Sequence, residues 1–123
     1  MTVATWNLQG SAGVDIVGVA GVIRQAAPDV VLIQEIGRQQ TRLLASNLGM
    51  TRRWAFKHLA WPQPEGLAVL TPHRIVASER LVLRREWWWN WRRRIAVIAE
   101  IGRGEERLDV INVHLSAHDD SAR

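Results

Sequence analysis

Two predicted strands near the N-terminus end on polar side chains that could do chemistry. The segment DVVLIQEIG starts with the apolar residues Val30 to Ile33, typical of a strand buried on both faces, and then reaches Gln34 and Glu35. A shorter β-favouring run ends at Asn7. Each residue also has an ordinary interpretation, Asn7 as a turn-forming amide and Glu35 as a loop residue.

Two later segments place further chemical groups at strand ends. In PEGLAVLTPHR, Glu65 precedes a buried apolar strand, although Pro-Glu-Gly alone is equally typical of a solvated turn. In LDVINVHLSAH, the alternation of side chains puts Asn112 and His114 on one face of a strand, next to each other at its end. A single histidine there is more often a hydrogen-bonded structural residue than a catalytic one.

Together, these residues are typical of one kind of chemistry. Hard cations such as Mg²⁺ bind oxygen ligands, commonly one or two carboxylates, with water and substrate phosphate completing the shell. A histidine beside such a cation could donate a hydrogen bond or a proton to a phosphoryl oxygen. The set of Asn7, Glu35, Glu65 and His114 therefore favours metal-assisted hydrolysis of a phosphoester.

The elements that must position these residues follow from the hydrophobic pattern. Apolar positions at helical spacing predict a helix over residues 14–27, capped by Ser11 and ended by Pro28, and a second helix over residues 38–48. The first half therefore alternates strand and helix, which makes its two strands parallel and brings their carboxyl ends to one edge. Strands are predicted afterwards at residues 53–59, 66–71, 74–83, 94–101 and 108–115, mostly antiparallel.

Composition sets the class of protein. The chain has 123 residues, 47% of them apolar, which predicts one globular domain over residues 1–123. Without cysteine it has neither disulfides nor thiolate metal sites. No signal peptide or membrane-spanning run is visible, so we expect a cytoplasmic protein. The net charge is +4 and every basic residue except Lys57 is arginine, which favours a phosphate-bearing partner.

Four segments occur in the order and approximate spacing of a known family: TWNLQG, PDVVLIQEI, EGLAVLTPHRI and LDVINVHLSAH. By these motifs the chain resembles the endonuclease/exonuclease/phosphatase superfamily, the DNase I-like proteins. Its members include nucleases, inositol polyphosphate phosphatases and neutral sphingomyelinases. Each motif is short, but four in order are specific and cover almost the whole chain. The resemblance implies an α/β sandwich of two packed sheets flanked by helices.

The resemblance also implies a role for individual residues. Asn7 would belong to the metal and phosphate site, and Glu35 would be the principal ligand of Mg²⁺ or Mn²⁺. Glu65 would orient the histidine, and His114 would contact the scissile phosphate as general acid or electrostatic stabiliser. We assign substrate contacts to three further residues, Asn112, Arg74 and Arg94, although TPHR around Arg74 departs from the Ser-Arg usual in the family.

Two motifs of the superfamily do not occur in this chain. Its members continue with Asp-x-Asn and end with Ser-Asp-His, whereas here His118 is followed directly by Asp119 and Asp120. We therefore expect the N-terminal half of the domain, an incomplete sandwich consisting of the first sheet with its flanking helices. An uncovered sheet face predicts marginal stability and self-association.

The segment RREWWWNWRRR, residues 84–94, has three interpretations. Tryptophan and arginine together suit single-stranded nucleic acid, an anionic membrane surface, or simple packing against a sheet.

The sequence as a whole predicts a metal-dependent hydrolase of phosphodiesters or phosphomonoesters, nuclease-like, acting on DNA, RNA or another phosphate-bearing substrate. One alternative is an inactive, truncated domain that binds nucleic acid or other anions. Another is a lipid phosphodiesterase that works at a membrane surface.

Overall fold

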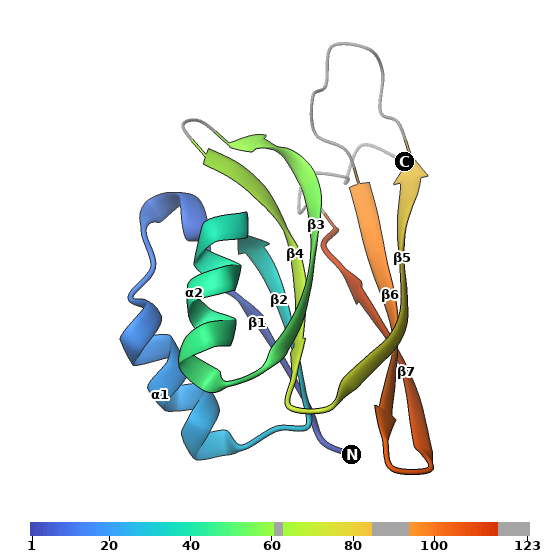
Figure 1. The fold of residues 1–123 in the computed structure, drawn as a ribbon. Helices are drawn as coiled ribbons and strands as arrows, with labels where there is room; N and C mark the ends of the chain where they lie inside the picture. The colour runs from blue at the N-terminus through green and yellow to red at the C-terminus, as the bar shows by residue number, and fades with distance from the viewer. Residues whose placement is uncertain (61–62, 85–93, 116–123) are drawn as a thin grey trace.

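The computed structural model describes residues 1–60, 63–84 and 94–115, which form an α/β sandwich (Figure 1). In chain order the elements are β1 (Val3–Asn7), the 3-10 helix η1 (Gly10–Ala12), α1 (Ile16–Ala26), β2 (Val30–Ile36), α2 (Arg38–Leu48), β3 (Thr51–Ala60), β4 (Gln63–Thr71), β5 (Arg74–Arg84), β6 (Arg94–Arg103) and β7 (Glu106–Val113). The predicted order, strands and helices first and antiparallel strands after, is confirmed.

The first sheet has the strand order β1-β2-β4-β3. β1 and β2 are parallel, with Val3 opposite Val30 and Asn7 opposite Gln34, because α1 forms the crossover between them. β4 is antiparallel to β2, so it begins at the edge where β1 and β2 end. Glu65, near the start of β4, therefore reaches the same edge as Asn7.

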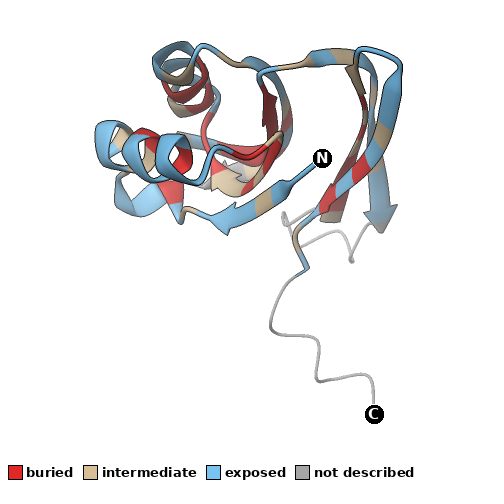
Figure 2. Ribbon diagram, turned by 90° about the horizontal axis from the view of Figure 1, so that it is seen from below, coloured by how far each residue is buried: buried red, intermediate tan, exposed pale blue. Residues whose placement is uncertain are grey.

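The second sheet, β5-β6-β7, is antiparallel and packs on the first. The core between the sheets is apolar and contains Val30, Ala55, Leu67, Val69, Ile95, Val97, Ala99, Ile101 and Val110. The other face of the first sheet packs on the two helices through a second core that includes Ala20, Ile23, Ile33, Ile36, Leu44 and Leu70. Helices, first sheet and second sheet thus form three layers, and the buried residues mark both interfaces (Figure 2).

The start of α1 differs from the sequence prediction. Ser11 lies in η1, and the helix is capped instead by Asp15, whose Oδ1 accepts a hydrogen bond from the backbone N–H of Gly18 at 3.1 Å. Gly13, with a φ of 92°, turns the chain between the two helices. The helix can begin only after this turn, so Ser11 is too early in the chain to cap it.

The sandwich contains more than the first sheet that we expected. Because β5, β6 and β7 cover the inner face of the first sheet, the face that no other described element covers is the outer face of the second sheet. There Ile111 is 60% exposed and Val113 37% exposed.

Some sequence predictions fall outside the described residues. They concern most of the tryptophan–arginine segment, at residues 85–93, and the residues His118, Asp119 and Asp120. Within the described part of the chain, no helix has the length and hydropathy needed to cross a membrane.

Candidate active site

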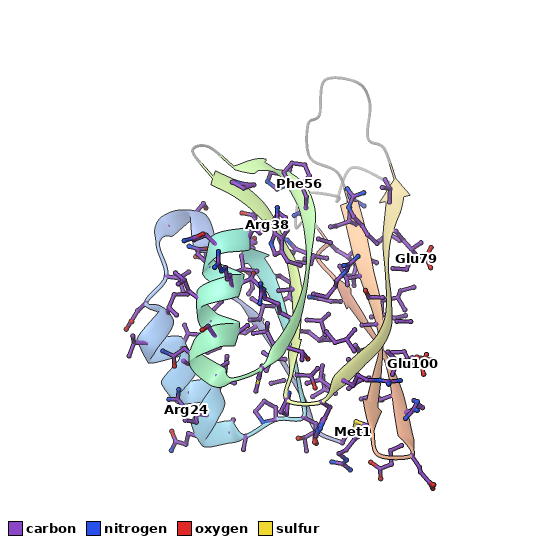
Figure 3. The ribbon with its side chains drawn as sticks, viewed as in Figure 1. Met1, Arg24, Arg38, Phe56, Glu79 and Glu100 are labelled. Carbon is purple, nitrogen blue, oxygen red and sulfur yellow. The ribbon has the colours of Figure 1, made fainter. Side chains whose placement is uncertain are left out.

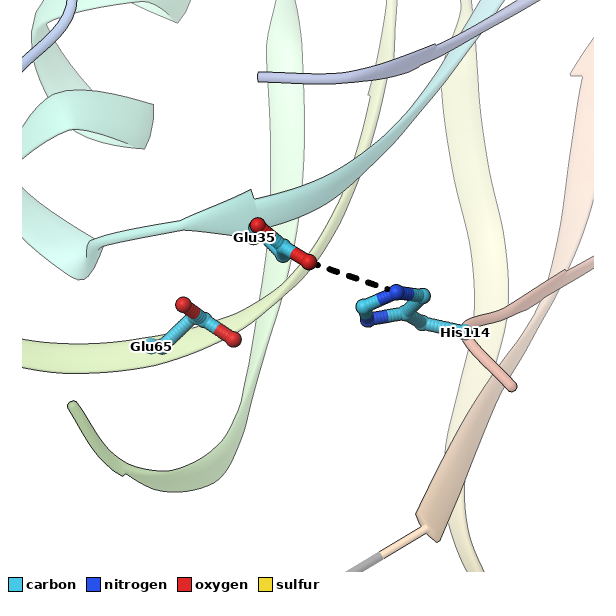
Figure 4. A group of neighbouring side chains, drawn as sticks. All are labelled: Glu35, Glu65 and His114. Atoms are coloured by element: carbon cyan, nitrogen blue, oxygen red, sulfur yellow. Dashed lines mark ion pairs between the residues drawn. The ribbon is translucent and has the colours of Figure 1, made fainter. Parts of the chain in front are cut away.

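Four polar residues from four strands meet at one edge of the sandwich. Asn7 ends β1, Glu35 lies near the end of β2, Glu65 near the start of β4, and His114 directly follows β7. One potential ligand atom from each of Glu35, Glu65 and His114 lies within 4.8 Å of the others (Figure 4). We call these three residues the acid–histidine cluster.

The backbone of β2 is irregular where it presents Glu35. The register of β2 with β4 skips one residue between Gln34 and Ile36, which marks a β-bulge. Glu35 itself has a φ of 55°, a left-handed conformation that is uncommon for residues other than glycine. A bulge turns a side chain away from its regular direction, and here it points the carboxylate out of the sheet toward His114.

The loop after β1 packs closely against this bulge. A Cβ atom at Gly10 would lie 2.5 Å from the carbonyl oxygen of Glu35 and 2.6 Å from Oε1 of Gln40. Only glycine therefore lets the loop approach so closely. Gln40 holds the same region by donating from Nε2 to the carbonyl of Gly10 at 3.0 Å.

Asn7 supports Glu35 directly. Its Nδ2 donates a hydrogen bond to Oε1 of Glu35 at 3.2 Å, while its Oδ1 accepts from the backbone N–H of Gln9 at 3.1 Å. This second bond orients the amide, so its N–H faces the carboxylate. Asn7 thus lies at the same strand edge as Glu35, as the predicted parallel pairing requires, and contacts its carboxylate.

His114 lies between a carboxylate and a lysine. Its Nε2 is 3.3 Å from Oε1 of Glu35, and its Nδ1 is 2.9 Å from Nζ of Lys57. An ammonium group can only donate, so a charged Lys57 requires Nδ1 to accept and places the ring proton on Nε2. Burial lowers the pKa of His114, and the charge on Lys57 lowers it further, while Glu35 opposes both. The neutral ring with a proton on Nε2 is therefore the favoured form.

Glu65 is almost buried, with 8% of its surface exposed. Its Oε1 lies 4.0 Å from Nζ of Lys57 and 3.6 Å from Nε2 of His58. The resemblance gave Glu65 the role of orienting the histidine. In the structure Lys57 lies beside both residues, so a link from Glu65 to His114 passes through Lys57.

Lys57 was not predicted as a site residue, although two signals pointed to it. It is the sole lysine of the chain, and in β3 it follows the buried Ala55 by two residues, at the point where the register with β4 shifts. Only 7% of its surface is exposed. A lysine is seldom so buried unless its charge has partners, and here these are His114 and Glu65.

Asn112, which the sequence assigned to the substrate, lies buried between the two sheets. It is 1% exposed, and its Nδ2 donates to the carbonyl oxygens of Ile33 and Ala68, each at 2.9 Å. Its Oδ1 accepts from Nε2 of Gln34 at 2.7 Å. Facing inward from β7, this amide joins the two sheets and holds the strand end that carries His114.

The two arginines assigned to the substrate lie at opposite ends of the sandwich. Arg74 begins β5 opposite Gly102, near the β6–β7 turn and far along the sheet from the acid–histidine cluster (Figure 1). The structure does not bring Arg74 to the site. Arg94 begins β6 at the end where β7 finishes, the same end as His114.

The site has the donor types that a hard cation needs. Glu35 and Glu65 help to line a cavity of about 10 Å³, together with Gly10, Ser11, Gly37, Gln40 and Pro64. That volume holds roughly one water molecule. Two carboxylates at such a cavity fit Mg²⁺ or Mn²⁺, which prefer oxygen ligands.

Comparison with known families agrees with this geometry. The model of the endonuclease/exonuclease/phosphatase family matches residues 4–104, which contain three of the four polar residues that meet at this edge. The chain belongs to the endonuclease/exonuclease/phosphatase family. A comparison with curated protein sequences gives no match.

Solved structures of the family share the fold. An endonuclease/exonuclease/phosphatase from Beutenbergia cavernae has a TM-score of 0.78 at 22% identity, covering 97% of this chain and 39% of its own. An endonuclease/exonuclease/phosphatase family protein from Leptotrichia buccalis has a TM-score of 0.77 at 17% identity. The match covers 98% of this chain and 57% of the Leptotrichia protein.

TDP2 from D. rerio, in a complex with a single-stranded DNA product, has a TM-score of 0.77 at 15% identity. The match covers 98% of this chain and 48% of the TDP2 chain. The chain thus spans between 39% and 57% of the length of these three structures.

Proposed function

We propose that this chain carries part of the active site of a metal-dependent, nuclease-like phosphoester hydrolase. The observation that supports this most is the meeting of Glu35, Glu65 and His114, from separate strands, within 4.8 Å. A family member needs carboxylates and a histidine at one edge of its sandwich for this chemistry. The β-bulge that turns Glu35 toward His114 also supports this proposal, because it brings the carboxylate to the histidine.

Each residue has a role that fits its contacts. Glu35, held by Asn7, is the principal carboxylate for Mg²⁺ or Mn²⁺, and Glu65 is the second acid at the cavity. When bound, the cation would neutralise phosphate charge and lower the pKa of a bound water. His114 presents its Nε2–H, which can donate to a phosphoryl oxygen in the transition state. Lys57 keeps that proton on Nε2.

The substrate class is part of the same proposal. The net charge of +4 favours an anionic substrate, and the similar TDP2 structure holds a single-stranded DNA product. DNA or RNA is therefore the substrate class we favour over a phospholipid headgroup.

A second candidate function is the binding of phosphate-bearing polymers without turnover. The chain spans about half the length of the solved relatives, and it lacks the Asp-x-Asn and Ser-Asp-His motifs. A chain with this half of the site could bind phosphate-bearing polymers without turnover. Cation binding and hydrolysis must therefore be measured separately.

The test uses Glu35→Gln, which keeps the shape of the side chain and removes its charge. We would measure Mn²⁺ binding by calorimetry and Mg²⁺-dependent hydrolysis of bis-(p-nitrophenyl) phosphate. We expect at least a tenfold loss of cation affinity, equivalent to about 1.4 kcal/mol. Glu79→Gln on β5 is the matched control, because Glu79 is exposed and lies outside the cluster (Figure 3).

The outcomes separate the two candidates. Loss of both binding and hydrolysis in Glu35→Gln alone supports the hydrolase. Cation binding that depends on Glu35 without any turnover supports the binding domain. Equal cation affinity in the two variants and the unsubstituted chain rejects Glu35 as a ligand and, with it, the proposed function.

A further inference from the structure

A groove lined by arginines runs along the edge strand β3. Its volume is about 1220 Å³, larger than the roughly 300–1,000 Å³ of a typical small-molecule pocket. Its basic residues come from three elements separated in the sequence: Arg38 and Arg42 of α2, Arg52 and Arg53 of β3, and Arg80 of β5. We call this feature the arginine groove.

The arginines flank β3 on both sides. Arg38 and Arg42 are four residues apart on α2, which places them on one face of that helix. Arg52 and Arg53 alternate on β3, so one side chain points to the helix layer and the other to the second sheet, where Arg80 lies. An extended chain lying along β3 would have cations on either side.

The positive charge of the arginine groove is not balanced locally. None of the described residues that line it is acidic, and all five arginines are exposed. Among ion pairs between described residues, none involves these arginines; Arg80 donates from Nε to the carbonyl of Phe56 at 2.9 Å. Like charges gathered in a hollow concentrate the electrostatic potential and attract a polyanion.

Two aromatic rings lie among these cations. Trp54 is anchored by its Nε1, which donates to the carbonyl of Ile36 at 2.9 Å. Phe56 is 37% exposed, and its ring centroid lies 6.3 Å from that of Trp54 at an angle of 59°. Arg38 and Phe56, which both line the groove, lie toward the same end of the molecule (Figure 3). Exposed aromatic faces can stack on unpaired bases.

The arginine groove adjoins the candidate active site. Pro64 lines both the groove and the small cavity that contains Glu35 and Glu65. An extended polymer bound along the groove would therefore reach the acid–histidine cluster.

We propose that the arginine groove binds the phosphate backbone of a single-stranded polynucleotide and guides it to the acid–histidine cluster. This inference rests on the proposed function and adds to it a surface that would bind the polynucleotide outside the acid–histidine cluster. Arginine pairs with phosphate through two hydrogen bonds. The aromatic rings can stack on the unpaired bases of a single strand, whereas the bases of a duplex are stacked on one another and are not accessible. A bilayer is a poorer fit, because rings in a hollow do not reach a flat surface.

Fluorescence anisotropy with a fluorescein-labelled oligothymidine of about 15 nucleotides tests the proposal. EDTA is present, so binding is measured without the cation and without turnover. The variant is Arg42→Ala/Arg53→Ala, which removes one arginine from α2 and one from β3. The control is Arg74→Ala/Arg107→Ala, which removes the same charge from exposed positions at the other end of the sandwich.

The groove variant should bind the oligonucleotide at least tenfold more weakly, and the control should change less than twofold. For single strands, the slope of log affinity against log salt changes by about 0.7 for each phosphate contact, so the groove variant should lose about 1.4. Circular dichroism checks that both variants are folded. Arg42→Lys/Arg53→Lys keeps the charge and should recover most of the salt slope.

Three results would overturn the proposal: equal losses in the groove and control variants, no salt-dependent binding at all, or tighter binding to phosphatidylserine vesicles than to oligothymidine. Glu35→Gln separates this test from that of the proposed function, since it should bind oligothymidine in EDTA at least as tightly as the unsubstituted chain. If Glu35→Gln binds oligothymidine and neither it nor the unsubstituted chain hydrolyses the phosphodiester, the proposed hydrolase function is rejected while the proposed binding of the polynucleotide by the arginine groove is retained.

Discussion

Asp29 is the most highly connected charged residue at the end of the sandwich away from the site. Its carboxylate accepts from the backbone N–H of Thr2 at 2.7 Å, and it lies 2.8 Å from His73 and 2.9 Å from Arg103. The hydrogen bond from His73, followed by those from Thr2 and Arg103, holds the pKa of Asp29 well below its usual range. One carboxylate thus joins the N-terminus, the β4–β5 turn and β6.

This pKa predicts an acid-dependent loss of stability. A carboxyl group whose pKa is lowered by folding stabilises the native state above its ordinary pKa of about 4, and this stabilisation is lost as the pH falls below that value. Asp29→Asn should therefore lower the free energy of unfolding at pH 7 and weaken its decline in acid. Urea unfolding from pH 7 downward measures both effects.

Asp109→Asn is the control for this prediction, because Asp109 is exposed on β7. If the two variants show the same pH dependence as the unsubstituted chain, the contacts of Asp29 do not stabilise the fold.

At the level of single residues, the sequence identified the polar side chains that meet at the site but not the residues that hold them in place. Asn7, Glu35, Glu65 and His114 were found because each lies at a predicted strand end. Lys57 was missed because its burial depends on the second sheet packing over β3. The burial of Asn112 was missed for the same reason, since alternation shows which side chains share a face but not what covers that face.

At the scale of the element, the bulge in β2 decides what Glu35 can do. A regular strand would direct the side chain at this position to a face of the sheet. The φ of 55° instead turns it toward His114, and backbone strain of this kind is often found at functional sites. The energetic cost of this backbone conformation can be measured separately from the effect of losing the carboxylate.

Two substitutions isolate that strain. Glu35→Gly and Glu35→Ala both remove the carboxylate, but only glycine adopts the left-handed conformation without a steric cost. We expect Glu35→Gly to be more stable than Glu35→Ala by about 1 kcal/mol in urea unfolding. A glycine variant less stable than the alanine variant would show that the backbone relaxes once the carboxylate is gone.

At the scale of the whole molecule, no described helix or strand covers the outer face of the second sheet. Ile111 points outward opposite Ile98 on β6, and Val113 lies opposite Ala96. The described helices cover only the first sheet (Figure 2). Exposed apolar side chains that adjoin one another on a sheet favour association.

We therefore predict that the chain self-associates through this face. Sedimentation velocity should show association that rises with concentration, and Ile111→Thr should weaken it, because threonine keeps the strand preference but removes apolar surface. Val17→Thr is the matched control, since Val17 is 72% exposed on α1, far from this sheet. Equal association of both variants would contradict the prediction.

Three features could be predicted from the sequence alone: the order of elements, the parallel pairing of β1 with β2, and the edge at which Asn7 and Glu35 meet. These features follow from local periodicity and from the handedness of a strand–helix–strand crossover, which need no knowledge of distant contacts. The family resemblance added the sandwich, which the fold confirms.

Only the tertiary structure decided how the site is built and what surrounds it. The bulge at Glu35, the burial of Lys57 and the bridging of the sheets by Asn112 all depend on packing between segments far apart in the chain. The arginine groove is the clearest case, because α2, β3 and β5 each supply only one or two of its arginines. Separate in the sequence, these residues form one surface only when the two sheets and the helix come together.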